Sequence, residues 1–151
     1  MARHVARIEW RSDGAFAAGR YSRRHQWSFD GGARVVASAS PDVVPVPMSD
    51  PAGVDPEEAL VAAVSSCHML WFLSLAQAAG LDVESYADEA EGEMGRIASG
   101  RMALTRITLR PEIVFSSDPP SQPQLEALHH QAHERCFIAN SLKTEVAVAP
   151  R

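Results

Sequence analysis

The chain has 151 residues, of which 46% are hydrophobic and 22% are charged, and its formal net charge at pH 7 is −5. This length predicts one domain over residues 1–151 that can bury a core, and the composition is typical of a soluble globular protein. Nucleic-acid binding is disfavoured because phosphate contacts need a basic face, and only Arg20, Arg23 and Arg24 lie close together.

The N-terminus predicts the compartment. The first ten residues are rich in charged side chains and lack the apolar stretch of a signal peptide, so we expect a cytoplasmic protein. In a reducing cytosol, paired cysteines are more often catalytic or redox-active than structural. The chain has two, Cys67 and Cys136, and their separation in sequence leaves open whether they meet.

Alternating residues predict two strands near the N-terminus. The first covers residues 6–11 as a half-buried strand and ends at a turn, Ser12-Asp13-Gly14. The second covers residues 21–30 and places Arg23 and His25 on its aromatic face, which we expect to face the core. A buried arginine is costly unless it is paired, so Arg23 is a candidate functional cation.

A Pro-rich segment over residues 41–56 predicts an ordered loop that leads into a helix. Asp55 is a suitable N-cap, Pro56 suits the first helical position, and Glu58 would complete a capping box. The pattern continues to residue 79, and Gly80 follows as a typical C-terminal residue.

This helix is apolar nearly all round, which is typical of a membrane span or of a fully buried core helix. The polar run Ser65-Ser66-Cys67-His68 at its centre and the composition of the other segments favour the core helix. A small monomer could not cover such a helix, so we expect a homodimer and no membrane partner.

The remaining elements alternate between strand and helix patterns. Residues 83–94 and 102–115 predict a hairpin, residues 123–135 a helix with one apolar stripe, and residues 142–148 a closing strand. The sum predicts an α+β protein in which a buried central helix packs on antiparallel strands.

Cys67 has two interpretations on its local sequence. Free cysteine is often a small buried hydrophobic residue. However, the polar run around Cys67 interrupts an apolar helix and favours a chemical role. A cysteine in mid-helix gains little from the helix dipole, so a reactive thiolate would need a cation from elsewhere.

Two motifs carry a resemblance to a known family. The run from Asp55-Pro56-Glu57-Glu58 to Cys67 resembles the central-helix signature of the OsmC/Ohr family, and Cys136-Phe137-Ile138-Ala139-Asn140-Ser141 resembles its second cysteine motif. Residues 86–92 and 109–111 resemble the hairpin of the OsmC-like branch. The similarity covers almost the whole chain.

The resemblance implies a fold and an activity. The fold would be an intertwined α+β homodimer with its sites at the subunit interface. Cys67 would reduce an organic hydroperoxide in oxidative-stress defence, become a sulfenic acid and condense with Cys136 to a disulfide. A dithiol reductant, such as a lipoylated protein, would reset the pair, and no metal or organic cofactor is implied.

In the family, an arginine steadies the thiolate and a glutamate holds the arginine. Glu57 matches the motif, although an acid in the first helical turn is also favoured by the helix dipole. Arg23 matches the OsmC-like branch and has His25 beside it, while Arg11 is the alternative; His25 could equally be a core histidine. Glu57 and Cys67 are ten helical residues apart, about 15 Å. A site in which Glu57 and Arg23 serve Cys67 of a partner subunit is therefore easier to build.

Two other classes remain open. A metal-binding protein is suggested by residue types alone, without typical ligand spacing; the residues are His25, Cys67, His68, His129, His130, His133 and Cys136. We expect the three histidines of residues 129–133 to be solvated, although His133 could approach Cys136. A non-catalytic ligand-binding member of the fold is the other class. The aromatic residues Trp27, Phe29, Trp71 and Phe72 favour an organic peroxide over hydrogen peroxide.

Overall fold

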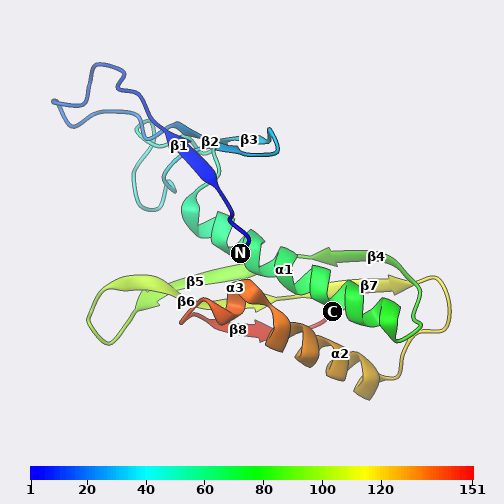
Figure 1. Cartoon of the computed structure of the whole chain (residues 1–151). Coiled ribbons are helices and arrows are strands. Elements are labelled where there is room, and N and C mark those ends of the chain that lie inside the picture. The colour runs from blue at the N-terminus through cyan, green and yellow to red at the C-terminus, as the bar shows by residue number, and fades with distance from the viewer. The chain divides into compact units, whose positions relative to one another are not determined.

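The computed structural model describes residues 1–151, and its internal contacts divide the chain into two compact units, residues 1–59 and 60–151. The chain forms eight strands and three helices, which confirms the α+β class, and Figure 1 shows how they follow one another. The single domain over residues 1–151 stays a prediction. In chain order the elements are β1 (Ala6–Glu9), β2 (His25–Phe29), β3 (Arg34–Ala37), α1 (Pro56–Ala78), β4 (Val83–Asp88), β5 (Glu91–Arg96), β6 (Met102–Leu109), β7 (Pro111–Phe115), α2 (Gln122–Arg135), α3 (Phe137–Asn140) and β8 (Glu145–Val148).

The first unit is built on an antiparallel sheet in the order β1-β2-β3. The turn at residues 12–14 is confirmed, since the Gly14 and Ala15 N–H groups donate to the side chains of Ser12 and Asp13. The prediction that the first strand is half-buried is wrong for this chain: every residue of β1 is exposed, and Ile8 by 57%. β1 lies at the edge of this sheet, and its residues remain exposed within the chain.

The predicted strand over residues 21–30 is only partly correct, because β2 begins at His25. The backbone of residues 21–24 bonds to groups other than a neighbouring strand. The Ser22 carbonyl accepts from the Trp10 indole N–H at 2.8 Å, and the Arg23 N–H donates to the Met48 carbonyl at 2.7 Å. These bonds satisfy the main chain in an irregular conformation that alternation cannot reveal.

Helix α1 begins and ends as its sequence predicts. Asp55 and Glu58 form the capping box, each side chain accepting from the other's backbone N–H at 2.8 Å. At the C-terminus Gly80 adopts a φ of 77°, and the N–H groups of Gly80 and Leu81 donate to the carbonyls of Gln77 and Ala76. This is the Schellman arrangement, for which glycine is the residue without a steric penalty.

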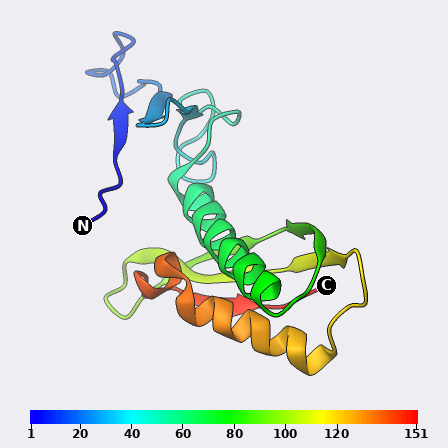
Figure 2. The same cartoon turned by 45° about the vertical axis from the view of Figure 1, so that its right-hand side comes forward.

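The second unit contains the predicted hairpin, but each long strand is broken. Strands β4 and β7 form one antiparallel pair, and β5, β6 and β8 form a second sheet in which β8 runs parallel to β6 (Figure 2). At the break, the Asp88 carboxylate accepts from the Arg110 N–H at 2.6 Å. A polar side chain therefore replaces a ladder hydrogen bond where the hairpin bends.

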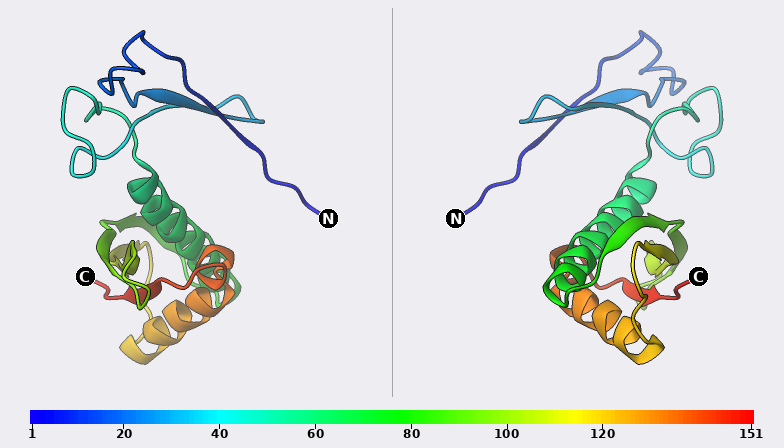
Figure 3. Two further views of the ribbon diagram at one scale, coloured as in Figure 1. Left: turned by 90° about the vertical axis from the view of Figure 1, so that its left-hand side faces the viewer. Right: turned by 90° about the vertical axis from the view of Figure 1, so that its right-hand side faces the viewer.

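Helices α1 and α2 pack on these strands in the second unit, as the two views in Figure 3 show. The predicted stripe on α2 is confirmed, with Leu128 and Ala132 in the core beside Phe72 of α1. A second cluster joins Val64 of α1 to Ile107 and Leu109 of β6. These two clusters fix the middle of α1, where Cys67 lies.

Only one side of α1 is covered in this chain. Its buried residues are spaced by four, Val64, His68, Phe72 and Ala76, whereas Leu70 on the opposite side is 61% exposed. The prediction that α1 is buried on all sides is therefore not fulfilled within one chain. By length and hydropathy α1 could also cross a membrane, a property that it shares with the core helices of soluble proteins.

Candidate functional site

The structure brings the two predicted cysteines together. Cys67 lies in the middle of α1, and Cys136 lies between α2 and α3, where its Sγ accepts from the Ala139 N–H at 3.4 Å. The two side chains are close enough for Cys67 to influence the pKa of Cys136, and both are free thiols. Cys136 is only 1% exposed, whereas Cys67 is partly exposed. Cys67 is therefore the sulfur that a reactant from solvent meets first.

The environment of Cys136 keeps it protonated. Burial is the main cause that raises the pKa of the Cys136 thiol to about 11; the Ala139 N–H opposes this, and the adjacent Cys67 adds to it. The Cys136 S–H also faces the Val64 carbonyl, 4.0 Å from the sulfur. A thiol held in this way is a weak attacking group at neutral pH, but it is positioned to react with an oxidised Cys67.

Two polar neighbours of Cys67 have structural partners. The Ser65 hydroxyl donates to Asp88 at the bend of the hairpin, and His68 forms a hydrogen bond of 3.1 Å with His129. At these two residues the polar run is therefore explained by packing partners and not by a chemical role. Sequence reasoning missed Asp88, and it named His129 only as a solvated histidine or metal ligand, because their partners lie more than 20 residues away.

The histidine pair is enclosed between α1 and α2. The two rings are parallel within 8°, and His129 also stacks on Phe72 at 4.6 Å. The pKa of each histidine is lowered to about 4, mainly by burial; the neighbouring His129 and His133 contribute to the lowering for His68, and Asp88 opposes it for His129. The prediction that residues 129–133 are solvated is wrong for His129, which is 4% exposed, and correct for His130. The approach of His133 to Cys136 stays a prediction.

An aromatic and cationic surface lies next to the cysteines in the second unit. Trp71, one helical turn after Cys67, contacts Phe137 edge-on at 5.5 Å, and the Arg135 guanidinium lies 5.7 Å from the Trp71 ring. Phe137 is 68% exposed. Sequence analysis did not single out Arg135, although it immediately precedes Cys136.

In the first unit, Arg23 lies in an aromatic groove. The groove has a volume of about 380 Å³, and the rings of Trp10, Phe16 and Tyr21 in it lie within 4.9–5.7 Å of one another. The Arg23 guanidinium stacks 3.6 Å above the Tyr21 ring and donates to the Tyr21 carbonyl at 2.6 Å. The lining residues are Ile8, Trp10, Phe16, Tyr21, Arg23, His25, Ser38, Ala39 and Pro56.

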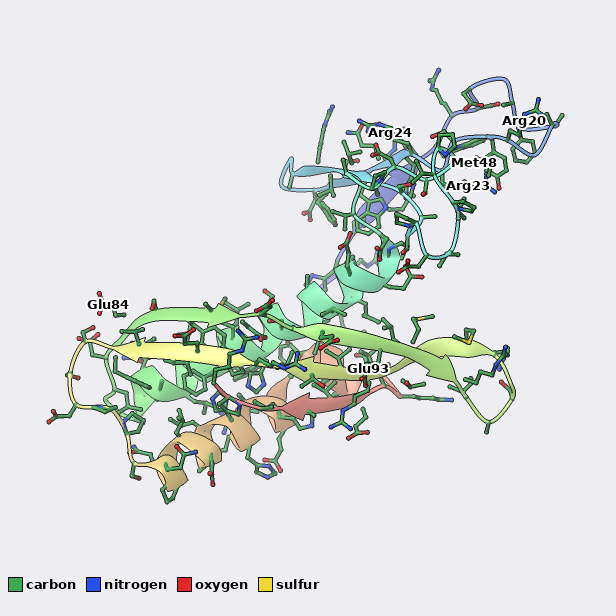
Figure 4. All side chains as sticks on the ribbon, turned by 180° about the vertical axis from the view of Figure 1, so that it is seen from behind. Arg20, Arg23, Arg24, Met48, Glu84 and Glu93 are labelled. Carbon is green, nitrogen blue, oxygen red and sulfur yellow. The ribbon has the colours of Figure 1, made fainter.

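The two arginines of residues 23–24 differ in their surroundings. Arg24 is exposed and pairs with the Asp50 carboxylate, whereas Arg23 is partly buried against the groove. Figure 4 shows Arg23, Arg24 and Met48 close together in the first unit. Arg11, the alternative cation, is exposed and does not line the groove.

Glu57 and His25 differ in how their polar atoms are used. One carboxylate oxygen of Glu57, Oε2, is enclosed and has no hydrogen-bond partner in the chain. His25 has a partner on both ring nitrogens, the Arg23 carbonyl at 2.7 Å and the Trp27 indole at 3.0 Å. Glu57 therefore retains an acceptor for a cation, and His25 has no free nitrogen for proton transfer.

The histidines of α2 line a second cavity. It has a volume of about 280 Å³, and its lining residues are Glu126, His129, His130, His133, Val146, Val148 and Pro150. No group of three or more His, Cys, Asp or Glu side chains in the chain is placed to hold a metal ion.

The sequence and the fold are similar to those of known proteins. The family model for OsmC-like proteins matches residues 49–151. An OsmC-like protein of unknown function from Vibrio cholerae is 52% identical, with all of both chains covered and a TM-score of 0.97. The uncharacterized protein YmaD of Bacillus subtilis is 26% identical over 107 residues, 68% of this chain and 70% of the Bacillus protein.

More distant structures share the fold. An organic hydroperoxide resistance protein from Elizabethkingia anophelis is 16% identical, covers 99% of this chain and 94% of its own, and has a TM-score of 0.72. A corresponding protein from Legionella pneumophila is 18% identical over 99% and 96% of the two chains, with a TM-score of 0.70. At these identities the likeness is one of fold.

Proposed function

Because the chain belongs to the OsmC-like protein family, we propose that it is a cytoplasmic thiol peroxidase that reduces organic hydroperoxides in oxidative-stress defence. The contact between Cys67 and Cys136 is the observation that supports this most. One sulfur is accessible and the other is buried beside it as a thiol. That asymmetry suits an attacking cysteine and a resolving cysteine.

The reaction has two steps on these sulfurs. The Cys67 thiolate attacks the outer peroxide oxygen, the O–O bond breaks, and the alkoxide takes a proton to leave as an alcohol. Cys67 is then a sulfenic acid. The Cys136 sulfur attacks the Cys67 sulfur, an S–S bond forms, and water leaves with the Cys136 proton. A dithiol, for which we propose a lipoylated protein, exchanges with this disulfide and restores both thiols.

We place Arg23 and Glu57 at the same centre through a second subunit. Glu57 and Cys67 lie ten residues apart on one helix, about 15 Å, which is too far for one arginine to bridge easily. The enclosed and unpaired Oε2 of Glu57 can accept the Arg23 guanidinium. In the dimer, Arg23 would then stabilise the thiolate of the partner subunit's Cys67.

Three features of the chain support a dimer. The side of α1 that carries Leu70 and both faces of β1 are uncovered. Residues 1–34 hold seven of the 14 basic side chains and only three of the 19 acidic ones, so this segment is complementary in charge to the acidic remainder. Exchange of the first unit between two copies would cover both surfaces.

The aromatic groove favours an organic substrate. Its three rings form an apolar wall with one cation, which suits a hydroperoxide with an apolar body. Two of the aromatic residues that the sequence suggested for binding an organic peroxide have other contacts. Phe72 is buried in the core, and the Trp27 indole donates a hydrogen bond to His25. Relatives from Elizabethkingia anophelis and Legionella pneumophila are organic hydroperoxide resistance proteins by name.

The test is peroxide-dependent loss of free thiols, measured with cumene hydroperoxide and hydrogen peroxide on the reduced chain. Wild type should lose two thiols per chain. Cys67→Ser should lose none, because the accessible nucleophile is gone. Cys136→Ser should stop at a Cys67 sulfenic acid that a dimedone probe labels and excess peroxide over-oxidises.

Each result is decisive for one assignment. A wild-type chain that keeps both thiols in excess cumene hydroperoxide would contradict the peroxidase and leave a non-catalytic ligand-binding member of the fold. A Cys136→Ser variant that cycles normally with dihydrolipoamide would remove the resolving role from Cys136.

A further inference from the structure

Arg23 is held at its backbone as well as at its guanidinium. Its N–H donates to the Met48 carbonyl at 2.7 Å, and its own carbonyl contacts the His25 Nδ1 at 2.7 Å. The guanidinium is fixed separately by the Tyr21 carbonyl and ring. Residues 21–24 belong to no strand, so these contacts take the place of a sheet ladder in setting where Arg23 points.

The hydrogen bonds determine the tautomer of His25. An indole N–H can only donate, so the His25 Nε2 that receives the Trp27 N–H at 3.0 Å must carry no proton. In a neutral imidazole the proton is then on Nδ1, which donates to the Arg23 carbonyl. Trp27 thereby selects the form of His25 that holds Arg23, in the way that second partners orient a catalytic group.

We infer that Trp27 and His25 are positioning residues that act through Arg23, so that the indole, the imidazole and the arginine together present the cation to the thiolate of the partner subunit's Cys67. This rests on the proposed function, in which Arg23 activates Cys67. His25, predicted from the sequence as a catalytic residue, has both nitrogens occupied and is therefore assigned to positioning. A cation already fixed in place costs no reorganisation during the reaction.

The experiment measures the pH dependence of Cys67 alkylation by iodoacetamide and the rate constant with cumene hydroperoxide, on the reduced full-length chain. Trp27→Phe removes one N–H and keeps an aromatic ring. We expect the apparent pKa of Cys67 to rise and its reaction at pH 7 to slow roughly tenfold, a size typical of a slightly misplaced catalytic group. Tyr86→Phe is the matched control, since the Tyr86 hydroxyl has no hydrogen-bond partner, and it should react as wild type does.

A double variant separates positioning from general damage. Arg23→Met should slow Cys67 more than Trp27→Phe does, and the double variant should be no slower than Arg23→Met alone, because Trp27 acts only through Arg23. His25→Asn, whose amide can still donate to the Arg23 carbonyl, should retain more activity than His25→Phe. The ¹⁵N shifts of His25 should change from the Nδ1–H form towards a mixture in Trp27→Phe.

The outcomes distinguish this inference from the proposed function. Additive losses in the double variant, or an unchanged Cys67 pKa in Trp27→Phe, would overturn the positioning role even if the wild type reduces peroxide. A wild type that reduces no peroxide would overturn the function, while the coupled alkylation rates would still support positioning of Arg23.

Discussion

At the scale of single residues, the polar run in α1 divides into two kinds of side chain. Ser65 and His68 face inward and bond Asp88 and His129, so they are explained by packing. Cys67 faces a different direction and meets Cys136. Adjacent helical residues point about 100° apart, so one polar run can serve both the core and a reactive surface.

The two arginines of residues 23–24 provide a test at this scale. Arg23→Met should raise the apparent pKa of Cys67 and slow peroxide reduction, because it removes the proposed cation beside the thiolate. Arg24→Met should leave both unchanged. The largest influence that lowers the pKa of Asp50 is the hydrogen bond from the Ala52 N–H, and Arg24 comes second. The Asp50 carboxylate therefore keeps its main partner in Arg24→Met. The measurement is thiolate absorbance against pH.

Similar titrations for both variants would show that Arg23 is not the cation. Arg11 would then be the next candidate, and Arg11→Met is the variant to make. Light scattering on each variant confirms that assembly is unchanged, so that a lost subunit contact is not mistaken for a lost charge.

At the scale of elements, α1 and α2 are joined by a buried histidine pair whose protonation opposes folding. The pKa of His68 and of His129 is lowered from 6.5 to about 4 in the folded chain. Between these values the unfolded chain binds more protons, so stability falls as pH decreases from about 6.5 towards 4 and is unaffected above about 7.

Urea midpoints at pH 7.5 and 5.0 measure this effect. The wild type should lose stability at the lower pH, whereas a His68→Met, His129→Leu double variant should lose less, because it has no histidine to protonate at this contact. His130→Gln is the control: His130 is exposed, pairs only with Glu134 on the surface, and should behave as wild type does. An equal acid response in the double variant would place the sensitivity elsewhere.

At the scale of the whole molecule, uncovered surfaces predict assembly. The protein should have twice the mass of one chain in light scattering at micromolar concentration. Leu70→Asp should shift the mass towards a monomer, because it places a charge on the uncovered side of α1. Val43→Asp, in an exposed loop, is the matched control and should remain dimeric. A wild-type monomer would contradict both the dimer and the shared site.

The sequence alone determined the features whose signals are local. The Asp55 capping box, the end of α1 at Gly80, the apolar stripe of α2 and the α+β class follow from neighbouring residues, and the structure confirms them. The motifs around Cys67 and Cys136 likewise indicated the family that the family model matches.

Only the tertiary structure decided what depends on distant partners. The contact between Cys67 and Cys136, the His68–His129 pair and the break in the hairpin at Asp88 join residues that are 20 or more positions apart. Periodicity records which face of an element is apolar but not what that face meets. The irregular segment at Arg23 shows this most directly, because its alternation fits a strand while its hydrogen bonds go to Trp10, Met48 and His25.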